Sequence, residues 1–186
     1  MIRTANDVSI VIGSWGSYNE CNERALGSKW LNLADYDSWD EIAKELENEG
    51  FELDGMDEEL FIQDIDNLPS SGTNWDYMNP ERLFEILKES EVLDDYRQYE
   101  TMEAFLEVRS FDDFMQRVED KGANWSDDIY IYHNYDWEDY GREMFSLNGC
   151  RMDENIEYFF DFEAYGKYIG SDYVEEYSDG LIEISY

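Results

Sequence analysis

The 186-residue chain is strongly acidic: 47 Asp and Glu stand against 13 Lys and Arg, which gives a formal net charge of -34. Nucleic acids and anionic membranes are excluded as partners, because binding them requires a basic face that neutralises phosphates. Disorder is excluded as well, since 42% hydrophobic and 17% aromatic residues are enough to build a packed core.

The acidic excess extends along three segments that loop-like stretches separate. Residues 1–66 carry a net charge of -13, residues 67–122 carry -8 and residues 123–186 carry -13. No segment is therefore an acidic tail attached to a neutral domain. We expect an α+β protein with one small domain from each segment: a mixed domain, a helical middle domain and a second mixed domain.

The first segment is predicted to combine strands with a helix. Alternating apolar residues indicate a strand at 8–12, and further strands are expected at 29–33 and 60–65. An apolar stripe at helical spacing predicts a helix between them, with Ser38 as N-cap and Glu41 as its capping-box partner. The stripe consists of Trp39, Ile42, Ala43 and Leu46.

The middle segment is predicted to be helical. Asn79 and Pro80 are typical of a helix start, and Ser110 with Asp113 forms a capping pair for a helix that ends at Gly122. Three apolar faces are expected: Leu83, Phe84 and Leu87; Met102, Phe105 and Leu106; and Phe111, Phe114, Met115 and Val118. The outer faces of these helices are acidic.

The last segment is predicted to return to mixed structure. Its expected elements are a strand at 129–132, helices at 137–147 and about 160–169, a strand at 173–177 and a final strand to Tyr186. Ser178, Asp179 and Gly180 are typical of the turn in a closing β-hairpin, after which Ile182, Ile184 and Tyr186 would face one way.

Catalysis is not expected. Among so many carboxylates, pairs suited to acid–base chemistry arise by chance, and the sequence has no phosphate loop and no nucleophile beside a base. The single histidine, His133, follows an apolar strand, where a lone histidine is more often structural than catalytic. Cys21 and Cys150 belong to no motif and, with no membrane-length apolar stretch, favour a cytoplasmic protein. We expect no cofactor.

Calcium binding has some support in the sequence, because Asp35 with Asp37, and Asp64 with Asp66, resemble the opening of an EF-hand loop. Both stretches lack the glycine at the sixth position and the glutamate at the twelfth. We expect no metal site, and a divalent-metal buffer is only a third possibility.

The surplus charge itself needs a reason. Solubility or a saline host would account for part of it, yet a net charge of about 2–8 keeps a small domain soluble. Self-repulsion among the remaining charges destabilises the compact state. Duplex DNA carries one charge per 1.7 Å of axis, so 34 charges correspond to about 58 Å, or roughly 17 base pairs.

Several stretches of the sequence resemble the ArdA-type antirestriction proteins, over nearly the whole length. They are Tyr18-Asn19 followed by Leu26-Gly27-Ser28-Lys29-Trp30-Leu31, the acidic strand Glu59-Leu60-Phe61-Ile62-Gln63-Asp64-Ile65-Asp66, the stretch Phe160-Asp161-Phe162-Glu163-Ala164-Tyr165-Gly166-Lys167-Tyr168, and the ending Asp179-Gly180-Leu181-Ile182-Glu183-Ile184-Ser185-Tyr186. The family consists of DNA mimics that inhibit Type I restriction-modification enzymes.

The resemblance implies an elongated three-domain protein that dimerises through residues 123–186 and occupies the DNA groove of a Type I methyltransferase core, which excludes DNA by competition. The alternative is an acidic module that sequesters another basic DNA-binding or defence protein. We expect the partner to contact exposed acids of helix faces and strand ends: Asp40, Glu41, Glu45, Asp64, Asp66, Asp112, Asp113, Glu138, Asp139 and Glu143.

Overall fold

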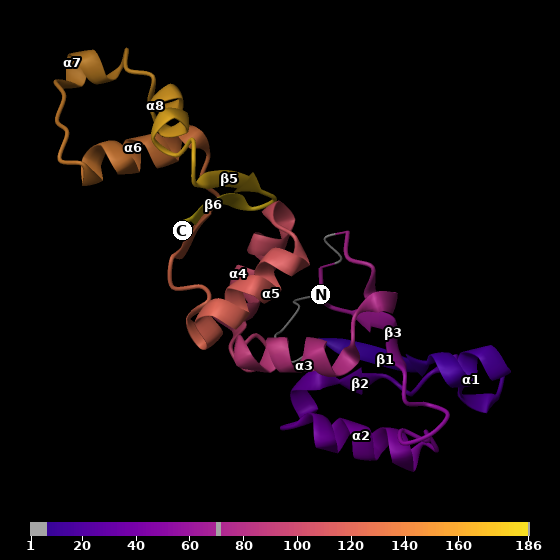
Figure 1. Cartoon of the computed structure of the whole chain (residues 1–186). Coiled ribbons are helices and arrows are strands. Elements are labelled where there is room, and N and C mark those ends of the chain that lie inside the picture. The colour runs from indigo at the N-terminus through magenta and orange to yellow at the C-terminus, as the bar shows by residue number, and fades with distance from the viewer. Residues whose placement is uncertain (1–6, 70–71, 186) are drawn as a thin grey trace. The chain divides into compact units, whose positions relative to one another are not determined.

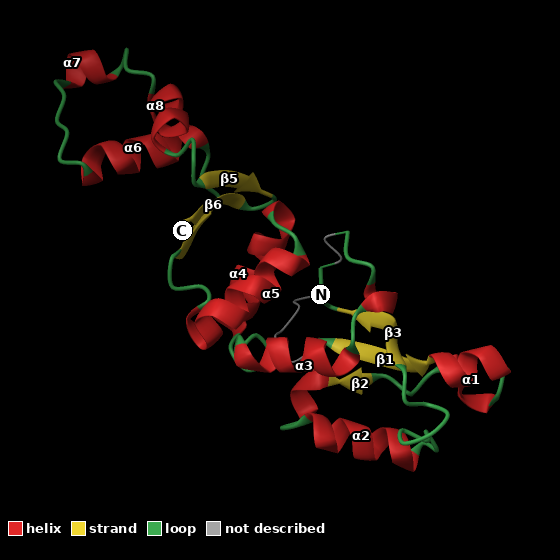
Figure 2. Cartoon of the chain, in the orientation of Figure 1, coloured by secondary structure: helices red, strands yellow, loops and turns green. Residues whose placement is uncertain are grey.

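The computed structural model describes residues 7–69 and 72–185, and the chain divides into two compact units, Met1–Trp125 (unit 1) and Ser126–Tyr186 (unit 2). Each unit combines α-helices with a three-stranded antiparallel sheet (Figures 1 and 2). The α+β class expected from the sequence is thus confirmed, and the finer division into three domains stays a prediction. Within the described residues, no helix combines the length and the apolarity that crossing a bilayer requires.

The sheet of unit 1 has the strand order β2-β1-β3. Its strands are β1 (Ser9–Ser14), β2 (Leu31–Asn32) and β3 (Leu60–Asp66). Ile10 and Ile12 of the central strand are fully buried, as the alternating pattern predicts. β2 is shorter than the expected strand 29–33, because the backbone N–H of Lys29 donates to the Glu49 carboxylate at 2.9 Å and a 3-10 turn begins at Leu33.

Two α-helices accompany this sheet: α1 (Trp15–Glu20), which the sequence pattern does not predict, and α2 (Trp39–Asn48). α2 begins where expected, but the predicted capping box is wrong. Ser38 stands at the N-cap without a side-chain cap bond, and Glu41 Oε2 instead accepts from the backbone N–H of Asp37 at 2.9 Å. Burial of Ile42 and Leu46, both fully enclosed, therefore holds the helix in place.

The helical part of unit 1 follows the predicted apolar faces. It consists of α3 (Pro80–Glu89), α4 (Tyr96–Val108) and α5 (Phe111–Lys121). The Ser110–Asp113 capping box is present, and Gly122 ends α5 with a positive φ of 59°. The core between these helices centres on Trp125, which is fully buried and donates from Nε1 to the carbonyl of Ser90 at 3.1 Å.

Unit 2 has the strand order β4-β6-β5 beside three helices (Figure 2). The elements are β4 (Ile129–His133), α6 (Trp137–Leu147), α7 (Glu154–Glu157), α8 (Phe162–Ile169), β5 (Val174–Tyr177) and β6 (Gly180–Ile184). α8 begins later than predicted because Asp161 caps it by accepting from the Ala164 N–H at 2.9 Å. The closing hairpin is confirmed, and Ile182 and Ile184 are buried. Tyr186 lies outside the described residues.

Helices α6 and α8 meet backbone to backbone at two glycines. A Cβ built on Gly141 would lie 3.0 Å from the backbone N of Gly166 and still closer to the carbonyl oxygen of Phe162. A Cβ on Gly166 would lie 3.0 Å from the N of Gly141 and closer again to the carbonyl oxygen of Trp137. Only hydrogen fits at either position, so this contact fixes how α6 sits on α8.

One acid of unit 1, Asp57, is buried and has a structural role. Asp57 is fully buried, accepts hydrogen bonds from Ser17 Oγ and from the backbone N–H of Glu52, and lies 3.2 Å from Arg24 Nε. Burial by itself would raise the pKa of Asp57, but these hydrogen bonds and the Arg24 charge lower it below its ordinary value. The ionised side chain ties α1 to the loop before β3.

Replacing Asp57 with asparagine is expected to lower the free energy of unfolding by about 2–3 kcal/mol, because Arg24 loses its buried partner. A lowered pKa means that this contribution is present above the ordinary pKa of 3.8 and is lost as pH falls through the folded-state pKa. Urea denaturation should therefore show a difference at pH 7 that shrinks below pH 3.8. The exposed neighbour variant Asp54→Asn is the control, and equal stability of both variants at pH 7 would contradict the assignment.

Candidate protein-binding surface

Six of the ten acids predicted to contact a partner lie in the first turn of a helix, and all six are exposed. They are Asp40 and Glu41 of α2, Asp112 and Asp113 of α5, and Glu138 and Asp139 of α6. The N-terminus of a helix carries a partial positive charge, so carboxylates at these positions also stabilise the helices. Ser110, for example, donates to Asp113 and lowers its pKa, which keeps this carboxylate ionised.

The other four predicted acids differ in exposure. Asp64 and Asp66 are exposed on β3, and one oxygen of each accepts the N–H of the following residue. Glu45 is only half-exposed and pairs with Lys29, which lowers the pKa of this carboxyl. Glu143 is half-buried and accepts a hydrogen bond from the Tyr135 hydroxyl. Asp64 and Asp66 are thus exposed to solvent, whereas Glu45 and Glu143 each interact with a side chain of the same protein.

An acidic ridge that sequence reasoning missed runs along α3 and α5. Glu81, Glu85 and Glu89 are exposed one helical turn apart, at steps of about 6 Å along the axis. Arg82 pairs with both Glu85 and Glu119, so α5 adds a fourth carboxylate. The i, i+4, i+8 spacing on α3 is visible in the sequence, whereas the contribution of α5 is not.

Several basic side chains of the described residues pair with neighbouring acids. Arg142 lies 2.8 Å from Glu138 and 3.1 Å from Glu157, and Lys167 Nζ lies 2.6 Å from Glu163. Such exposed pairs contribute little stability, but they consume the few cations that could neutralise the surface. Most carboxylates therefore keep their charge facing solvent.

Residues 7–69 and 72–185 also contain possible metal ligands and nucleophiles, which could form other kinds of site. No group of three or more His, Cys, Asp and Glu in this part could hold a metal ion. His133 ends β4, where its Nδ1 lies 3.1 Å from Asp179 Oδ2 and from the Tyr177 hydroxyl. Cys21 and Cys150 are both free and exposed.

The comparison with protein families decides the family. The family model described as antirestriction protein (ArdA) matches residues 10–183, nearly the whole chain. The chain belongs to the ArdA family. Membership makes it an antirestriction protein, one that acts against restriction enzymes, as the resemblance of its motifs predicted. No curated protein matches the chain.

The ArdA match spans both units and includes all ten predicted acids. An antirestriction protein needs a surface that a restriction enzyme recognises, and carboxylates are abundant among the exposed side chains of this ArdA chain.

Proposed function

We propose that the protein mimics DNA: it occupies the DNA groove of a Type I restriction-modification enzyme and excludes DNA by competition. The observation that carries the proposal is the exposure of carboxylates in the first turns of α2 and α5 in unit 1 and of α6 in unit 2, while several of the few cations pair with neighbouring acids. A groove that binds duplex DNA presents Lys and Arg to phosphates. Carboxylates at helix surfaces offer these cations the same charge.

The proposed partner is the methyltransferase core, and the proposed compartment is the cytoplasm, where cellular DNA and its restriction enzymes meet. The chain is also proposed to act as a homodimer through residues 123–186. Unit 2 exposes large apolar side chains that a second copy could cover, among them Ile156, Tyr158 and Phe159 at 58%, 86% and 81% exposure. Sedimentation velocity distinguishes the 22.2 kDa monomer from a dimer.

The deciding experiment is displacement of labelled DNA from a purified Type I methyltransferase, followed by fluorescence anisotropy. Competition requires that the protein concentration for half-displacement rises in proportion to the DNA concentration. If saturating DNA fails to relieve the inhibition, the proposed competition is wrong. If the protein binds other basic DNA-binding proteins but not this enzyme, the sequestering alternative replaces it.

Neutralising acids one at a time is expected to have small effects that accumulate. An exposed ion pair contributes about 0.2–1 kcal/mol, so Asp112→Asn should raise the half-displacement concentration by no more than about fivefold. Combining it with Asp40→Asn and Asp64→Asn should multiply the losses. Gln116→Ala, an uncharged change on α5, is the control. Complete loss from Asp112→Asn alone would point to an enzyme-like site instead.

A further inference from the structure

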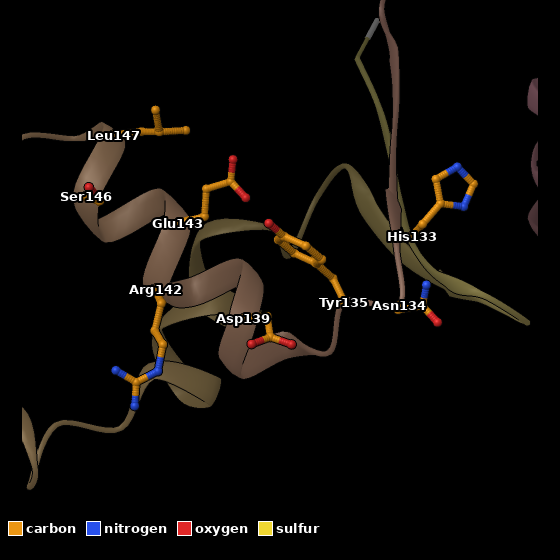
Figure 3. Close-up of a pocket in the computed structure, with 8 residues that line it drawn as sticks. All are labelled: His133, Asn134, Tyr135, Asp139, Arg142, Glu143, Ser146 and Leu147. Carbon is orange, nitrogen blue, oxygen red and sulfur yellow. The ribbon is translucent and has the colours of Figure 1, made fainter. Parts of the chain in front are cut away.

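A pocket of about 620 Å³ opens in unit 2 between α6 and the turn that follows β4 (Figure 3). Tyr135 lines it from the turn, while Asp139, Glu143 and Leu147 line it from α6. These three α6 residues are spaced four apart, so they share one face of the helix. The pocket thus has two carboxylates in its wall, an aromatic ring opposite them and an exposed leucine at its edge.

The aromatic wall is held in place. The Tyr135 ring packs against Tyr132, with centroids 5.6 Å apart, and its hydroxyl donates to Glu143. Figure 3 shows Tyr135 and Glu143 turned toward each other. This hydrogen bond raises the pKa of the Tyr135 phenol, so the hydroxyl stays a donor at neutral pH.

Arg142 and His133 also line the pocket, but the Arg142 guanidinium is directed away from Tyr135. Arg142 pairs with Glu138 and Glu157, and its guanidinium lies 4.2 Å from the centroid of the Phe162 ring. Figure 3 shows this side chain leaving α6 away from Tyr135. The charge of Arg142 is therefore balanced by Glu138 and Glu157, and neither Asp139 nor Glu143 is its partner.

We propose that this pocket receives an arginine side chain of the restriction enzyme, with the guanidinium bound by Asp139 and Glu143 and stacked on the Tyr135 ring. The inference rests on the proposed function. It assigns to one position of the acidic surface a specificity for arginine that the other acids lack. A guanidinium is planar, bonds carboxylates in pairs and stacks on aromatic rings, whereas an ammonium is a compact and strongly hydrated charge. A flat ring beside two carboxylates therefore fits arginine better than lysine.

The two acids of the pocket should then contribute more than two acids on an open helix. Anchors that insert into a pocket are among the few interface residues with large effects, whereas exposed pairs contribute little. Asp139→Asn with Glu143→Gln is expected to raise the half-displacement concentration about 30-fold. The matched control, Glu81→Gln with Glu89→Gln, removes the same charge from the acidic ridge and is expected to raise it about fivefold, or about twofold for each exposed acid.

A second pair of variants leaves the charge unchanged. Tyr135→Leu keeps apolar bulk against Tyr132 but removes the flat ring, and it is expected to weaken displacement about tenfold. Tyr135→Phe keeps the ring and is expected to stay within about threefold of the original protein. Thermal melting of each variant checks that unit 2 remains folded. Equal displacement by Tyr135→Leu and Tyr135→Phe, or equal losses in the pocket and ridge pairs, would overturn the proposal.

A titration without the enzyme separates this inference from the proposed function. Agmatine, which carries a guanidinium, is expected to shift the amide NMR signals around Tyr135 and Glu143 more than 1,4-diaminobutane, which has the same charge. Equal shifts would mean a general cation site, and shifts spread evenly over the protein would mean no site; either result rejects the arginine pocket. If the protein does not displace DNA at all, the proposed function is wrong. The titration still tests whether the pocket binds a guanidinium.

Discussion

Raising the salt concentration from about 50 to about 200 mM is expected to weaken the complex with a Type I methyltransferase at least about a hundredfold. Proteins that make 6–10 phosphate contacts lose roughly 10³–10⁵ in affinity over this range, because bound ions are exchanged for salt bridges. A protein surface holds a weaker atmosphere of condensed ions than duplex DNA does, so the expected loss is set below that range. Anisotropy titrations at four salt concentrations give the slope of log Kd against log salt.

Unfolding by salt cannot produce this loss. Salt screens the repulsion among the 47 acids and should raise the melting temperature of the free protein. Circular dichroism in the same buffers checks this point. A complex whose affinity does not change with salt would be held by apolar contacts, and DNA mimicry would then have to be abandoned.

Adding one methyl group at Gly141 or Gly166 is expected to destabilise unit 2 by about 3 kcal/mol or more. Alanine is a better helix former than glycine by about 1 kcal/mol, so a loss of stability has to come from the collision with backbone atoms across the α6–α8 contact. Those atoms belong to the helices themselves and cannot swing aside as a flexible side chain would. Hydrogen exchange of the α6 and α8 amides measures the loss directly.

The matched control for the glycine variants is Ser146→Ala, which adds helix propensity at an exposed position of α6. Its stability should equal or exceed that of the original protein. Exchange rates in Gly141→Ala and Gly166→Ala that match this control would show that α6 and α8 can move apart without cost, in which case the glycines have no structural role.

The strongly periodic segments could be predicted from the sequence because their signals are local. The helix 137–147 has the bounds that were expected, and the Ser110–Asp113 cap forms as its spacing indicates. α1 and α7 could not be predicted, since helices of six and four residues are too short to be stable alone. α1 depends on distant contacts, such as Trp15 stacking on Phe61 at 4.2 Å.

The candidate surface was predictable to the extent that exposure follows from helical spacing. Asp40 and Asp112 are exposed because they lie opposite apolar stripes. The pairing of Arg82 with Glu119, 37 residues away, and the complete burial of Asp57 depend on how separate elements pack. The pocket beside Tyr135 depends on the same packing, so none of these features has a local signature.

The acids at the helix N-termini affect how the net charge of this protein can evolve. Asp136 and Asp161 each accept a backbone N–H at 2.9 Å as caps, while Asp139 and Glu163 sit beside them in the first turns. A mutation that removes such a carboxylate weakens a helix as well as lowering the charge. Selection against misfolding alone would therefore slow the drift of this protein toward neutrality, even in a host without restriction enzymes.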